Sequence, residues 1–154
     1  MGRRILIWGL RFVAALLVMV LLGSILQSLF VQQAWSVAAG QAAGTGPVDI
    51  PMDHRLGWIA HDLVGLQPLY GVLTAIALLV AFIAAELVSR LIGLRVVVFA
   101  VAGAVAIYIL FMALKMNLGT VGVFGARGTM GIAAQMAAGL IAGASFAVLT
   151  RRRA

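Results

Sequence analysis

Two histidines and a neighbouring aspartate are the residues whose types come closest to those of a chemical site. His54, His61 and Asp62 lie in one polar segment between apolar stretches. The histidines are seven residues apart, which puts them on one helical face but about 10 Å apart along the axis. A zinc-binding helix needs histidines four residues apart. We therefore expect no metal or cofactor, but a polar outer site in which His61 could respond to pH near neutrality.

The serines and carboxylates do not predict a catalytic site. No serine sits in a nucleophile-elbow motif. Glu86 lies in an apolar stretch, whereas Asp49, Asp53 and Asp62 belong to the polar segment. We place Glu86 and these aspartates at opposite faces of a membrane, so they cannot act as a catalytic pair. We predict no catalytic residues, and a membrane enzyme that acts on lipid through the His–Asp region is the weakest of three hypotheses.

A second candidate site combines two cations with glycine-rich backbone. Glycines recur every third residue from Gly119 to Gly131, between two apolar stretches. Lys115 and Arg127 flank the start of the second stretch, and Thr129 is a candidate cap for its helix. A helix N-terminus with glycine-rich backbone and two cations suits an anion or a lipid phosphate. The spacing is not that of a phosphate-binding loop, and the simpler interpretation is a turn.

Two amide side chains extend this candidate site. Gln27 and Gln135 lie in the outer halves of the first and the last apolar stretch. Together with Lys115 and Arg127 they form the set on which a small transporter or channel for an anion or amphiphile would depend. Polar residues in such helices more commonly serve helix packing, so the same amides also fit a protein without a solute path.

The setting of these residues is that of a membrane protein. Of the 154 residues, 64% are hydrophobic and 10% are charged, which is far from the composition of a soluble domain. Four apolar stretches approach the roughly 20 residues that a membrane-spanning helix needs. We therefore predict an all-α membrane protein in which the single domain 1–154 forms a four-helix transmembrane bundle. The predicted spans are 5–31, 69–89, 96–114 and 130–150.

Basic residues gather at alternate ends of the spans. Three lie at one membrane face (Arg55, Lys115, Arg127) and eight at the other (Arg3, Arg4, Arg11, Arg90, Arg95, Arg151, Arg152, Arg153). The positive-inside rule then places both termini and the 90–95 turn in the cytoplasm, as in a bacterial inner membrane. Attraction to anionic lipid headgroups explains the net charge of +7 more simply than nucleic acid does.

The start of the chain allows one alternative. Arg3 and Arg4, the apolar stretch and the small residues 37–39 resemble a secretory signal peptide. The apolar stretch is longer than the core of a typical signal peptide. We therefore expect the first span to be retained in the membrane.

The outward segment 32–68 changes in composition. Residues 41–47 predict a flexible connector. A short helix is predicted over 53–65, with Asp53 as its N-cap. Leu56, Ile59 and Leu63 fall near one face of this helix. We expect an amphipathic helix that lies on the outer membrane surface.

Two spacings predict contacts between helices. Gly131, Gln135, Gly139 and Gly143 recur every four residues in the last span, and such a row lets another helix approach closely. That helix could belong to the same bundle or to a second copy, and the row does not distinguish the two. Glu86 precedes Arg90 by four residues, which favours a local ion pair over a proton or cation site.

These observations favour a non-enzymatic membrane component, either an accessory subunit or a self-associating bundle. Its partners would be the lipid bilayer and a second copy or another membrane protein. The small transporter or channel is the alternative, and the lipid-acting enzyme is the second alternative.

Overall fold

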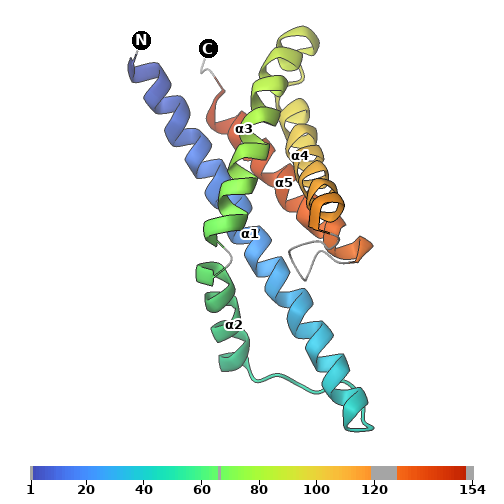
Figure 1. The fold of residues 1–154 in the computed structure, drawn as a ribbon. Coiled ribbons are helices and arrows are strands. Elements are labelled where there is room, and N and C mark those ends of the chain that lie inside the picture. The colour runs from blue at the N-terminus through green and yellow to red at the C-terminus, as the bar shows by residue number, and fades with distance from the viewer. Residues whose placement is uncertain (1, 66, 119–127, 152–154) are drawn as a thin grey trace.

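The computed structural model describes residues 2–65, 67–118 and 128–151, and the regular structure in this part of the chain is entirely helical. Its five helices are α1 (Gly2–Ala42), α2 (Met52–Gly65), α3 (Gln67–Ile92), α4 (Arg95–Leu118) and α5 (Thr129–Leu149). Figure 1 shows α1, α3, α4 and α5 packed side by side, with α2 against the far half of α1.

Four of these helices are long and apolar enough to cross a membrane. The candidate spans are Ile5–Ala42, Tyr70–Ile92, Arg95–Asn117 and Thr129–Leu149. They correspond to the four apolar stretches of the sequence, so the predicted all-helical class with four apolar helices is confirmed. The chain has the build of a polytopic membrane protein.

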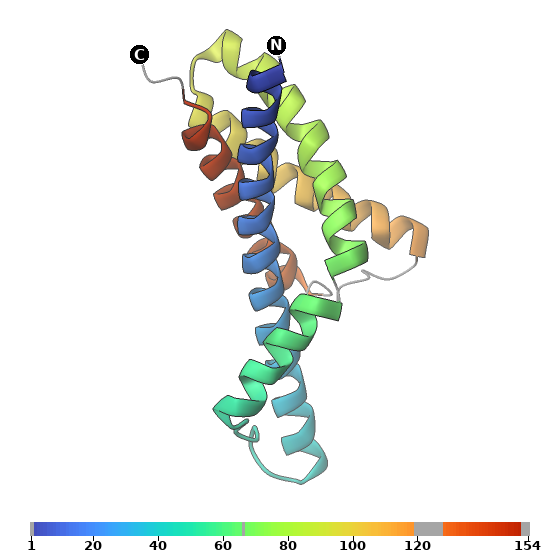
Figure 2. The same cartoon turned by 90° about the vertical axis from the view of Figure 1, so that its left-hand side faces the viewer.

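Both chain ends lie at the same end of the molecule. In Figures 1 and 2 the start of α1, the end of α5 and the turn between α3 and α4 are grouped together, while the α1–α2 turn lies at the opposite end. This arrangement follows from an even number of alternating long helices. It gathers Arg90, Arg95 and Arg151 at one end.

Helix α1 is longer than the sequence analysis predicted. The first span was expected to end near Val31, but the helix continues without a break to Ala42 and comprises 41 residues. At 1.5 Å per residue it is about 60 Å long, roughly twice the hydrocarbon thickness of a bilayer. Residues 32–39 contain polar side chains but no glycine or proline, so nothing in them ends a helix.

The extension of α1 forms a helical hairpin with α2, made by residues 32–65 (Figure 2). The Trp35 and Trp58 rings meet edge to face, with centroids 5.7 Å apart. In the connection, the Val48 N–H donates to the Ser36 carbonyl at 3.1 Å, and Gly44 takes a positive φ of 67°. Part of the expected flexible connector is thus a defined turn. Helix α2 begins at Met52, so Asp53 lies in its first turn and not at the N-cap.

Glycines bring α4 and α5 into backbone contact. A Cβ atom at Gly139 would lie 2.6 Å from the Gly103 carbonyl oxygen, and one at Gly143 would collide with the Phe99 carbonyl. Gly131 is also buried on α5. The part of the predicted row that carries Gly139 and Gly143 is therefore covered by α4 of the same chain, which explains these two glycines without a second copy.

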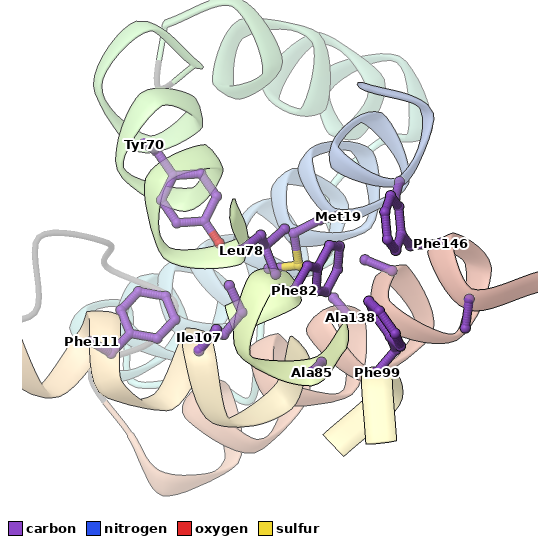
Figure 3. Packing of buried hydrophobic residues seen from close by; sticks show 14 residues of the cluster. Met19, Tyr70, Leu78, Phe82, Ala85, Phe99, Ile107, Phe111, Ala138 and Phe146 are labelled. Carbon is purple, nitrogen blue, oxygen red and sulfur yellow. The ribbon is translucent and has the colours of Figure 1, made fainter. Parts of the chain in front are cut away.

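An aromatic cluster holds the four candidate spans together at the end that carries the termini. The Phe146 ring of α5 lies 4.7 Å from Phe82 of α3, 5.3 Å from Phe99 of α4 and 5.4 Å from Trp8 of α1, measured between centroids. Figure 3 shows the three phenylalanines together, with Met19 and Leu78 beside them. Contacts at these distances add stability beyond area burial.

The α4–α5 contact predicts that one of two glycine substitutions destabilises the protein and that the other does not. Gly139→Ala puts a methyl group against the Gly103 carbonyl and should cost about 1–3 kcal/mol, as overpacking does. Gly9→Ala is the matched control, because a Cβ atom on this α1 glycine meets nothing within 4 Å. Thermal unfolding in detergent should show a lower midpoint for Gly139→Ala alone. Equal midpoints for both variants and the wild type would contradict the backbone contact.

Candidate functional site

Gln135 joins three helices through hydrogen bonds inside the bundle. Its side chain on α5 is buried, and its Nε2 donates to the Gly23 carbonyl of α1 at 2.9 Å. Its Oε1 accepts a hydrogen bond of 3.0 Å from the Tyr70 hydroxyl of α3. The amide that was a candidate ligand-binding residue therefore bonds to neighbouring helices at both ends.

Gln27 belongs to a row of buried polar side chains on α1. It follows Gly23 by one turn and is buried together with Ser24, Ser28 and Gln32. The Gln32 Nε2 donates to Ser28 Oγ and to the Arg55 carbonyl of α2, both at 3.1 Å. Gln32 did not stand out in the sequence because we placed it beyond the end of the first span.

The structure does not bring Lys115 and Thr129 to the two amides. Lys115 is exposed in the last turn of α4, and Thr129 is the exposed first residue of α5. Thr129 was predicted to be the N-cap of α5, but the residue at the N-cap is Gly128. Arg127 and Gly119–Gly125 of the glycine series lie outside the described residues.

The histidine region is a surface feature of α2. His54 and His61 are exposed, and Asp62 is partly exposed. The nearest acid to His54 is the neighbouring Asp53, with Nε2 and Oδ2 3.9 Å apart. Within residues 2–65, 67–118 and 128–151, no three His, Asp or Glu side chains are grouped so that they could hold a metal ion.

A polar cavity of about 560 Å³ opens at the end of the molecule that carries both termini. We call it the arginine pocket. It lies between α1 and α3, with the start of α4 and the residue after α5 completing it. Its lining comes from three helices (α1, α3 and α4) and from the residue after α5, namely Ile7, Trp8, Arg11, Glu86, Arg90, Arg95 and Thr150.

Glu86 links the charged groups of this pocket. Its carboxylate lies 3.4 Å from the Arg90 guanidinium, which confirms the predicted pair four residues apart, and 2.7 Å from the Arg95 guanidinium. Arg95 also donates to Thr150 Oγ1 at 3.0 Å and lies 4.7 Å from the centroid of the Phe99 ring. The sequence analysis identified the local pair but missed Arg95, whose partner Thr150 is distant in sequence.

A double-mutant cycle tests the hydrogen bonds of Gln135. Tyr70→Phe and Gln135→Leu should each lower the free energy of unfolding, and the double variant should lose less than the sum. We expect a coupling of about 0.5–1.7 kcal/mol, the range for side-chain bonds between membrane helices. Chemical unfolding in mixed micelles measures all four proteins. Strict additivity would show that the two side chains do not bind each other.

Comparison of the chain with family models, with curated proteins and with solved structures finds no match. What the protein does must therefore be inferred from its own residues and their arrangement.

Proposed function

We propose that this protein is a non-enzymatic component of a bacterial cytoplasmic membrane that crosses the bilayer four times as one domain. It would serve as a self-associating unit or as an accessory subunit of another membrane protein. The observation that carries this proposal is that polar side chains of the bundle bind neighbouring helices. Gln135 bonds to Gly23 and Tyr70, and Arg95 joins Glu86 to Thr150. Such contacts hold a bundle together in lipid.

The placement of charge supports an orientation with both termini in the cytoplasm. Arg90, Arg95 and Arg151 lie with the chain ends at one end of the molecule, and Arg55 lies in the helical hairpin toward the other. The excess of arginine at the first end follows the positive-inside rule. Helix α2 packs against the extension of α1 through Trp35 and Trp58 and has no buried side chain; we propose that its exposed face contacts the outer headgroup layer.

An apolar groove between α3 and α4 supplies a surface for association. It encloses about 770 Å³ and is lined almost entirely by small or β-branched side chains, including Ala77, Ala81, Ala84, Val101, Ala102 and Val105. Small residues allow a neighbouring membrane helix to approach closely. The glycine row of α5 is already covered by α4, so we assign association to this groove, with a second copy of the chain as its occupant.

Introduced cysteines test this assignment, because the chain has none of its own. Ala84→Cys lies in the groove and should give a disulfide-linked dimer when membranes are oxidised. Leu17→Cys is the control, since Leu17 is exposed on α1 outside the groove. Non-reducing gels measure the dimer fraction, which should be several-fold higher for Ala84→Cys. Equal fractions, or no dimer from either variant, would contradict self-association through the groove.

The buried polar row of α1 favours a second candidate function, a small transporter for an anion. Ser24, Gln27, Ser28 and Gln32 share one region of α1 and are all buried, and intramembrane polar groups also mark solute paths. Proteoliposomes that contain a chloride-sensitive dye test this alternative. A chloride transporter would give measurable chloride flux in the wild type, and Gln27→Leu would reduce this flux several-fold. Gln33→Leu, at an exposed position, is the control and would leave the flux unchanged. Wild-type protein without flux would remove chloride transport from consideration.

A further inference from the structure

We infer that the arginine pocket binds a phosphate group, carried by a membrane lipid or free in solution. The inference rests on the proposed function in one respect, because it takes the end with both termini to lie at a membrane face. The shared chemistry is an oxyanion with several acceptor atoms. Guanidinium groups match it better than ammonium groups because two parallel N–H donors can face two oxygens.

The pocket carries more positive than negative charge. Three guanidinium groups line it, from Arg11, Arg90 and Arg95, and Glu86 is the carboxylate among its lining residues. Glu86 is shared by Arg90 and Arg95. In the part of the chain that the structure describes, no side chain pairs with Arg11. Two positive charges of the pocket therefore have no counter-charge within its lining, and a bound phosphate would offset them.

The position of Arg11 makes an anionic partner favourable. It is partly buried and lies nine residues after the first residue of α1, within the candidate span Ile5–Ala42. A charge inside an apolar span is costly unless it pairs or reaches the interface. Trp8 lines the same pocket, and tryptophan is enriched at the level of lipid headgroups. Arg11 and Trp8 together mark the depth at which a lipid phosphate would lie.

Arg95 is already held in place for such a ligand. Glu86 at 2.7 Å, Thr150 at 3.0 Å and the Phe99 ring at 4.7 Å fix its guanidinium. A donor that is ordered before binding loses less conformational entropy when the ligand arrives. Its buried Nε atom has no hydrogen-bond partner among the described residues, which leaves one N–H of this arginine unsatisfied. The volume of about 560 Å³ falls in the range of small-ligand sites.

Lipid binding by the purified protein tests the inference, with Arg11→Gln as the main variant. Arg11 pairs with no side chain among the described residues, so this change should leave the fold intact. Arg151→Gln is the matched control, because Arg151 is exposed at the same end and outside the pocket. Native mass spectrometry in detergent, with phosphatidylglycerol or phosphatidylcholine added, measures the bound fraction. The wild type and Arg151→Gln should prefer phosphatidylglycerol, and Arg11→Gln should bind it about tenfold more weakly, as expected for one lost charge-assisted bond.

A third titration with inorganic phosphate identifies the source of the ligand. Binding of phosphatidylglycerol alone, with loss in Arg11→Gln, supports a lipid headgroup. Binding of inorganic phosphate with the same loss supports a soluble ligand at the same site. Arg95→Lys keeps the positive charge but not the planar guanidinium, so it should also weaken binding several-fold. The thermal midpoint of Arg11→Gln should stay at the wild-type value.

Two results separate the failure of this inference from the failure of the proposed function. The phosphate site alone is overturned if the wild-type protein needs detergent to stay in solution but binds neither phosphatidylglycerol nor inorganic phosphate. It is also overturned if Arg11→Gln binds these probes as strongly as the wild type does. Wild-type protein that stays monodisperse without detergent overturns the membrane assignment, and the phosphate inference with it.

Discussion

Inside a bilayer no water is present to satisfy a polar group, and this constraint shapes the whole bundle. Helix α5 satisfies this constraint through hydrogen bonds to its neighbours. Gln135 binds α1 and α3 near one end of α5, and Thr150 receives the Arg95 side chain just beyond its other end. Between these points Gly139 and Gly143 let the α4 backbone close against α5. The polar bonds thus fix the register in which the apolar surfaces meet.

Charged side chains are distributed unevenly between the two ends of the molecule. The end with both termini carries Arg11, Arg90 and Arg95 around a single glutamate, directly beside the aromatic cluster that includes Trp8 and Phe99. The opposite end carries a helical hairpin in which α1 extends well past the reach of α3, α4 and α5 (Figure 1). In the proposed arrangement the first end would face anionic headgroups, and the other would present a helix pair at the opposite side of the membrane.

The sequence analysis predicted features that depend on local spacing. Four apolar helices follow from hydropathy, and the Glu86–Arg90 pair follows from one helical turn. Contacts between distant residues could not be predicted, because one sequence does not fix which helix faces which. Tyr70 and Gln135 are 65 positions apart, and Arg95 and Thr150 are 55 apart. The same limit left the occupant of the glycine row undecided until α4 was seen against it.

The end of α1 shows a different limit. Gln32 and Gln33 lower the hydropathy, and the first span was therefore ended at Val31, but a drop in hydropathy ends a membrane span without ending a helix. Continuation to Ala42 requires only residues that tolerate helical backbone. The helical hairpin, its Trp35–Trp58 contact and the buried Gln32 all follow from this extension.

The most direct test of this account is the side of the membrane on which each end of the bundle lies. Thr45→Cys, in the exposed α1–α2 turn, and Leu94→Cys, in the exposed α3–α4 turn, can each be treated with a membrane-impermeant maleimide on intact spheroplasts. The account predicts that Thr45→Cys reacts at once and that Leu94→Cys reacts only after the membrane is permeabilised. Reaction of Leu94→Cys from outside, or reaction of both positions from the same side, would contradict the four-span arrangement with cytoplasmic termini.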